Sequence, residues 1–113
     1  MNFLAHFHLA QATDGSRVGA LLGDFVRGTP ESLRTRLPSE LVDGIILHRA
    51  IDRFTDTHEV FLRTKKLLSP PRRRFAGIIV DIFFDHFLAH MWSDYSKIPL
   101  RQFITEIHDI LNR

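Results

Sequence analysis

The spacing of apolar residues predicts helices along most of the chain. The apolar positions keep a helical spacing from about residue 3 to residue 12, and "TDGS" then interrupts the pattern. Ser16 is placed to cap a second helix. In that helix Gly19 and Gly23 lower the helix propensity, but they would let another backbone approach closely.

The middle of the chain predicts a central helix between two shorter elements. Residues 27–38 form a connector with room for one helical turn. From Pro38 onward, the segment that ends in "LHRAIDRFTD" has apolar residues on more than one side, which is typical of a central helix. Thr57 is placed to cap a shorter helix that ends near Leu68.

The last third of the chain predicts one long helix and one amphipathic helix. Ser69 followed by Pro70 is a typical helix start, and we expect that helix to end near Trp92. "DYSKIP" interrupts it, and residues 100–111 form a strongly amphipathic last helix. We see no alternating strand pattern and no internal repeat. The sequence therefore predicts a single all-α domain over residues 1–113, with about five to six helices.

The last helix has a wide apolar face close to the final residue, Arg113. That face either packs inside a compact bundle or waits for a partner chain or for further sequence. A homodimer formed through this helix is therefore one expectation.

Composition excludes several classes of protein and site. The chain has no cysteine, which excludes disulfides and thiolate metal sites. Its beginning, "MNFLAHFHLA", has no basic leader and carries two histidines, so it is a poor signal peptide. No apolar run approaches the roughly 18–20 residues needed to span a bilayer. We expect a cytoplasmic enzyme or interaction domain that is not bound to a membrane.

Basic residues are clustered although the net charge is only +2. The clusters are "RTR" (34–36), "KK" (65–66) and "RRR" (72–74). Such clusters can attract an acidic protein, a phosphate ligand or nucleic acid. Each cluster alone is explained equally well as the solvated end of a helix.

Acidic residues and histidines occur inside apolar segments. In "DIFFDHFLAH" (81–90), Asp81 and Asp85 lie four residues apart and would share one face of a helix. Two like charges at this spacing cost roughly 0.2–0.5 kcal/mol. Burial adds a larger cost unless each carboxylate is paired or binds a metal.

Further candidates come from other expected helices. His48 and Asp52 are four residues apart and can meet a common ion, while His6 and Asp24 also lie among apolar residues. Histidine and carboxylate ligands without thiolates suit Mn²⁺, Fe²⁺, Zn²⁺ or Mg²⁺. Taken singly, each residue is also explained as a core histidine or as half of an ion pair, so spacing alone leaves a metal site and a purely structural role open. If the chain is an enzyme, a metal-activated water is the most natural nucleophile, because no other nucleophile motif is present.

Four segments together resemble the acyl carrier protein phosphodiesterase family: "MNFLAHFHLA", "GDFVRG", "LHRAIDRFTD" and "DIFFDHFLAHMW". They occur in the family's order between residue 1 and about residue 92. The resemblance implies an HD-like helical bundle, since that family is similar to a divergent branch of the HD metal-dependent phosphohydrolases. It also implies that Mn²⁺ is the cofactor and that acyl carrier protein, an acidic protein, is the substrate. The implied reaction hydrolyses the phosphodiester between 4'-phosphopantetheine and a serine of the carrier.

The resemblance also implies roles for individual residues. The positions that match the family are His6, His8, Asp24, Arg27, His48, Arg49, Asp52, Asp56, Asp81, Asp85 and His86. Five of them are the expected metal ligands: Asp24, His48, Asp52, Asp85 and His86. Catalytic or orienting roles are implied for three: Asp24, Asp81 and His6. Two are expected to hold the phosphodiester: Arg27 and Arg49. His90 departs from the pattern, because the expected histidine falls one place later, at Met91.

Family members are expected to continue well beyond the point where this chain ends. We therefore expect a fragment, a truncated gene product or a short variant that completes its fold by dimerising. Two alternatives to the phosphodiesterase stay open: a metal-dependent hydrolase of a nucleotide or small phosphoester, and a non-catalytic helical module that binds carrier protein or self-associates. Nucleic-acid binding through residues 72–74 is a weaker alternative, because no nucleic-acid motif accompanies them.

Overall fold

The computed structural model describes residues 2–113 and, within that range, every side chain except that of residue 73. The described backbone forms helices and contains no strand, which confirms the all-α prediction. In chain order the elements are α1 (Phe3–Leu9), α2 (Asp14–Leu22), α3 (Pro30–Arg34), α4 (Ser39–Asp56), α5 (Glu59–Lys65), the 3₁₀ segment η1 (Pro70–Phe75), α6 (Ala76–His90), the 3₁₀ segment η2 (Trp92–Asp94) and α7 (Leu100–Leu111).

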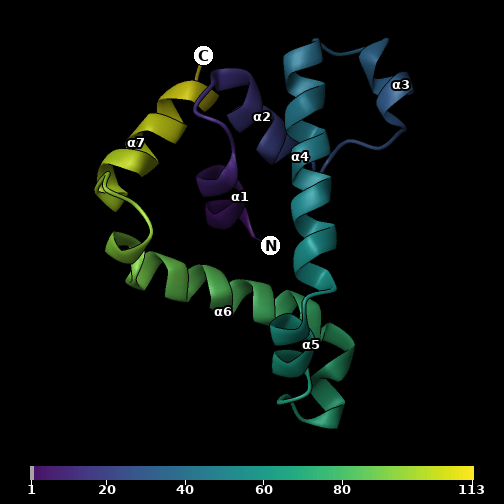
Figure 1. Ribbon diagram of the computed structural model, residues 1–113, viewed down its shortest axis with the longest axis vertical. Coiled ribbons are helices and arrows are strands. Elements are labelled where there is room, and N and C mark those ends of the chain that lie inside the picture. The colour runs from purple at the N-terminus through teal and green to yellow at the C-terminus, as the bar shows by residue number, and fades with distance from the viewer. Residues whose placement is uncertain (1) are drawn as a thin grey trace.

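Helix α1 lies in the middle of the molecule (Figure 1). It packs against α2 and α6, and α2 in turn packs against α4 and α7. Helix α6 runs across the end of α1 from α5 to η2, and α7 then returns toward α2. A residue on α1 can therefore face α4 on one side and α6 on the other.

Helices α2 and α4 cross at two glycines. A Cβ atom on Gly19 would lie 2.7 Å from the Cα of Gly44, and a Cβ on Gly44 would lie 2.9 Å from the Cα of Gly19. Side chains at either position would push the helices apart, so the crossing depends on both glycines. The expected close approach at Gly19 is confirmed. It brings the last turn of α2 next to the middle of α4.

Two groups of apolar side chains form the core. The first joins α3 to α4 through Leu33, Val42 and Ile45. The second consists of Trp92, Phe103 and Ile107, with partly buried side chains of α1 packed against it. Contacts within the chain therefore bury Phe103, Ile107 and Ile110 of α7, whereas Ile104 and Leu111 stay exposed. A homodimer through this helix stays a prediction.

Three local expectations need correction. Thr13, and not Ser16, caps α2, because its side chain accepts a hydrogen bond from the backbone N–H of Ser16. The cap of α5 is His58, whose Nδ1 accepts from the N–H of Val60, while the Thr57 hydroxyl donates back to a carbonyl of α4. Helix α6 begins only at Ala76, after the 3₁₀ segment η1.

Among the helices of residues 2–113, none is both long and apolar enough to cross a membrane. Helix α6 is strongly apolar, yet several of its large side chains are about half exposed or more, including Ile78, Ile82 and Phe83.

Candidate metal centre

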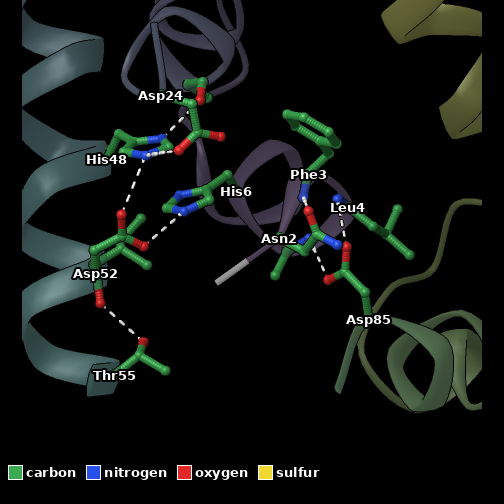
Figure 2. Close-up of polar contacts among 12 residues, drawn as sticks. Asn2, Phe3, Leu4, His6, Asp24, His48, Asp52, Thr55 and Asp85 are labelled. Atoms are coloured by element: carbon green, nitrogen blue, oxygen red, sulfur yellow. Dashed lines mark hydrogen bonds and ion pairs between the residues drawn. The ribbon is translucent and has the colours of Figure 1, made fainter. Parts of the chain in front are cut away.

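Two histidine rings are stacked in the interior, one from α1 and one from α4. The rings of His6 and His48 lie 3.6 Å apart between centroids, with an angle of 9° between their planes. Each residue is only 2% exposed. Figure 2 shows both rings in the space between α1 and α4.

A single carboxylate meets both rings. One oxygen of Asp52 lies 2.9 Å from the Nε2 of His6, and the other lies 3.2 Å from the Nε2 of His48. Asp24, on the loop after α2, adds a third oxygen 3.2 Å from the same nitrogen of His48. The four side chains come from α1, α4 and the loop after α2, and the structure brings them together (Figure 2).

The hydrogen bond behind His48 fixes its tautomer. The Nδ1 of His48 lies 2.7 Å from the carbonyl oxygen of Ala20, which can only accept, so this nitrogen carries a proton. In the neutral ring, Nε2 then presents a lone pair to the oxygens of Asp24 and Asp52. Lone pair and carboxylates repel each other unless a proton or a metal cation lies between them. A backbone carbonyl behind a metal-binding histidine is a frequent arrangement, because it orients the ring and raises its basicity.

The ionisation of the cluster suits a cation. Burial and the nearby ring of His48 lower the pKa of His6, so the neutral ring that a metal requires is favoured. Burial raises the pKa of Asp52, but interactions with nearby positively charged groups outweigh burial and bring this pKa below its ordinary value. Asp52 is therefore ionised beside a neutral His6.

The spacing of the donor atoms fits a divalent ion. One ligand atom each from His6, His48 and Asp52 lies within 4.8 Å of the others. Adjacent ligands of an octahedral ion with bonds of about 2.1 Å are about 3 Å apart. The distances from Asp52 to the two histidines have this value. Nitrogen and carboxylate donors of this kind suit Mn²⁺, Fe²⁺ or Zn²⁺.

Glycine is required where α2 ends against the cluster. A Cβ on Gly23 would collide with the ring of His48. Gly23 thus lets the His48 ring pack against the end of α2, next to Asp24. The sequence predicts a close backbone neighbour at Gly23, and the structure has a histidine ring there instead.

The structure does not bring Asp85 and His86 into this cluster. Asp85 accepts hydrogen bonds from the backbone N–H groups of Leu4 and Ala5, on the other side of α1 (Figure 2). Burial raises the pKa of Asp85, while these two N–H groups oppose the rise. His86 is exposed, with its ring against that of Phe87 and stacked at a longer distance on His90.

Asp81 lies on α6 one turn before Asp85, close enough to Asp52 and Asp56 of α4 for their charges to act on it. It lines a largely apolar cavity of about 490 Å³ together with residues of α1 and α6, among them Ala5, Phe84 and Leu88. Burial, followed by the charges of nearby carboxylates, raises the pKa of Asp81. The carboxylates that act on Asp81 are those of Asp56 and Asp52, while the carboxylate of Asp85 is held by the N-terminus of α1.

The two expected phosphodiester-binding arginines lie near the loop that carries Asp24. Arg49 donates to the backbone carbonyl of Gly28 over 2.8 Å and to that of Val26 over 3.4 Å. These bonds hold the loop in place, and Gly28 in that loop has a φ of +129°. Arg27 is exposed on the same loop. Of the two residues, Arg27 is the more exposed.

Sequence comparison gives an independent result. A family model described as acyl carrier protein phosphodiesterase matches residues 1–113. Among curated proteins, an acyl carrier protein phosphodiesterase of Enterobacter sp. (strain 638) is 44% identical over 109 residues, which cover 96% of this chain and 55% of that protein. Proteins with the same name from Klebsiella pneumoniae (strain 342) and Photorhabdus laumondii are 43% and 47% identical, over 92% and 82% of this chain and 53% and 46% of their own length. The chain spans about half the length of the curated relatives it matches. No solved structure matches it.

Proposed function

Since the chain belongs to the acyl carrier protein phosphodiesterase family, we propose that it contributes a divalent-metal centre to hydrolysis of the 4'-phosphopantetheine–serine phosphodiester of holo acyl carrier protein. In this reaction water adds to phosphorus, the bond to the serine oxygen breaks, and that oxygen takes up a proton. The products are apo carrier protein and phosphopantetheine. Carrier proteins of fatty acid synthesis would place the reaction in the cytoplasm.

The observation that carries the proposal is the convergence of His6, His48 and Asp52 from two helices far apart in the sequence. We propose that these three residues and Asp24 hold the ion, and that the ion is Mn²⁺. A divalent ion bound there would polarise the phosphoryl oxygens and lower the pKa of a nearby water molecule. The cluster has the neutral histidine and the ionised carboxylate that such an ion needs.

The chain's own groups have separate tasks around the ion. The carbonyl of Ala20 holds the His48 ring with Nε2 toward the carboxylates. Asp24 and Asp52 supply the negative charge that favours a dication. Arg49 holds the loop after Asp24, and Arg27 on that loop is available to contact a phosphate oxygen. Asp85 and His86 do not belong to the ligand set in this proposal.

An acidic carrier protein would meet one basic region at the end of the molecule where α5 and η1 meet (Figure 1). Its residues are Lys65, the last residue of α5, Lys66 directly after it, and Arg72 and Arg74 of η1. Arg34 is less available, since it pairs with Asp43 over 2.8 Å. Basic patches of this kind accelerate encounter with an acidic partner and lose that effect as salt increases.

The proposal is tested by incubating the protein with holo carrier protein and Mn²⁺ and following the mass of the carrier. We expect conversion to the apo form, and no conversion with Asp52→Asn. Intact holo carrier protein in the presence of demonstrably bound metal would remove the claim. A panel of nucleotides and small phosphoesters is tested in parallel. Hydrolysis of one of these would indicate another metal-dependent hydrolase, whereas a non-catalytic module would hydrolyse none of them.

A further inference from the structure

The first three residues of α1 have backbone N–H groups with no acceptor inside the helix, and all three groups are hydrogen-bonded. The N–H of Phe3 donates to the Asn2 side chain over 3.0 Å, and the N–H of His6 then makes the first bond of the helix, to the Asn2 carbonyl over 3.2 Å. The other two free groups, from Leu4 and Ala5, donate to the two carboxylate oxygens of Asp85, over 3.0 and 3.2 Å. Two of the three free N–H groups at this helix end therefore depend on a residue of another helix.

The contact between Asp85 and α1 joins segments that are far apart in the chain. Asp85 lies on α6, about 80 residues after its two donors. A helix of seven residues is not stable alone in water, so its position depends on such tertiary contacts. Hydrogen bonds to an ionised carboxylate are stronger than neutral ones. Asp85 thus sets where the first turn of α1 lies and how it is rotated.

The same turn carries His6. The residue follows Ala5 directly, and its ring points away from Asp85, toward His48 and Asp52 (Figure 2). Its Nε2 lies 2.9 Å from Asp52, within a stack whose rings are 3.6 Å apart. A shift of the turn by 1 Å would break both relationships, because neighbouring residues of a helix move together.

We propose that Asp85 is a positioning residue, which holds the backbone of Leu4 and Ala5 so that His6 reaches the metal centre from the other side of α1. The functional role of this contact rests on the proposed metal centre, because His6 is one of the proposed ligands. Both oxygens of Asp85 are engaged with α1, so it acts through His6 and not on the ion. It replaces the expected role of Asp85 as a ligand.

The first test uses the metal-free protein and NMR. Stacking on His48 shifts the ring protons of His6 upfield, and the Asp85 carboxylate protects the Leu4 and Ala5 amides from exchange. In Asp85→Asn we expect these amides to exchange about tenfold faster or more, since charged hydrogen bonds are lost, and the upfield shift of His6 to decrease. Asp94→Asn, an exposed carboxylate of η2, should leave both unchanged. An Asp85→Asn protein in which His6 keeps its shift would overturn the proposal.

The second test uses Co²⁺ as a spectroscopic probe of the ligand set. At saturation, Asp85→Asn should show the wild-type absorption spectrum with affinity lowered about 10–100-fold, the usual loss for a residue that orients a ligand. His6→Ala should change the spectrum itself. A changed spectrum in saturated Asp85→Asn would mean that Asp85 is a ligand, and would contradict the positioning role.

If wild-type protein binds no Co²⁺, the proposed metal centre fails, whereas the NMR test still decides whether Asp85 positions His6. If Asp85→Asn does not fold, Asp85→Glu keeps the charge and displaces the carboxylate by one methylene. It should reduce the His6 shift too, and an unchanged shift would overturn the proposal.

Discussion

The rings of His6 and His48 lie parallel, with centroids 3.6 Å apart, although they come from helices α1 and α4. Two imidazolium ions at this distance would repel each other, so full protonation of the pair is unfavourable. With neutral rings, the Nε2 of His48 faces carboxylate oxygens with a lone pair. A cation beside the Nε2 atoms removes both conflicts.

Replacing Asp52 should weaken metal binding more than replacing Asp24. Asp52 lies beside both histidines, whereas the contact found for Asp24 is with His48 alone. We expect Asp52→Asn to lower Mn²⁺ affinity by at least about 10–100-fold, measured by titration calorimetry, and Asp24→Asn to have a smaller effect. Asp43→Asn, on the exposed side of α4, is the matched control and should bind as the wild type does. The reverse order would contradict the bridging role of Asp52.

An added methyl group at Gly23 should displace the His48 ring. A Cβ there collides with the ring, whereas a Cβ on Gly77 of α6 meets nothing within 4 Å. Gly23→Ala should therefore lower Mn²⁺ affinity and the melting temperature together. Gly77→Ala should be neutral or stabilise by about 0.5–1 kcal/mol, the usual difference between alanine and glycine in a helix. Unchanged Mn²⁺ affinity in Gly23→Ala would show that metal binding does not depend on the position of the His48 ring.

The two arginines near the Asp24 loop should behave differently. Arg49→Ala removes two hydrogen bonds to backbone carbonyls and should lower the free energy of unfolding by about 1–3 kcal/mol. Arg27→Ala should leave stability unchanged and lower kcat/KM toward holo carrier protein. Urea denaturation and steady-state kinetics measure the two effects. Loss of stability in Arg27→Ala would assign that side chain a structural role.

The raised pKa of Asp81 predicts that the free energy of unfolding depends on pH. Burial raises its pKa in the folded protein above the value in the unfolded chain, so the folded state binds more protons between these two values. The ionised carboxylate therefore destabilises the fold increasingly as the pH rises through this window, and the effect is constant above it. Asp81→Asn should raise the free energy of unfolding at pH 7, by less than about 1 kcal/mol because solvent screens a half-buried group. Near pH 3 the variant and the wild type should be similar, and an equal gain at both pH values would contradict this account.

The helices could be predicted because their apolar spacing is local information. The residues at which the helices begin are harder to predict from the sequence. Thr13 and Ser16 are both good caps, and the choice between them follows from the Ser16 side chain, which is buried and accepts from the N–H of Gln11. A cap by His58 has weak sequence preference compared with Thr57 next to it.

The candidate site was predictable where its members share a helix or an apolar neighbourhood. His48 and Asp52 follow from their spacing of four residues, and Asp24 and His6 from charge in apolar surroundings. Asp85 looked equally suitable as a ligand. Its partners are backbone N–H groups about 80 residues away, and no local pattern distinguishes a carboxylate that anchors a helix from one that binds an ion.

The central claim is that His6, His48, Asp24 and Asp52 surround one divalent ion. Crystals grown with Mn²⁺, with data collected to locate the ion by its anomalous scattering, test it most directly. The account predicts one peak between the Nε2 atoms of the two histidines and the carboxylate of Asp52, with Asp85 still bound to α1. A peak at Asp85 and His86, or no peak in crystals that contain saturating Mn²⁺, would contradict it.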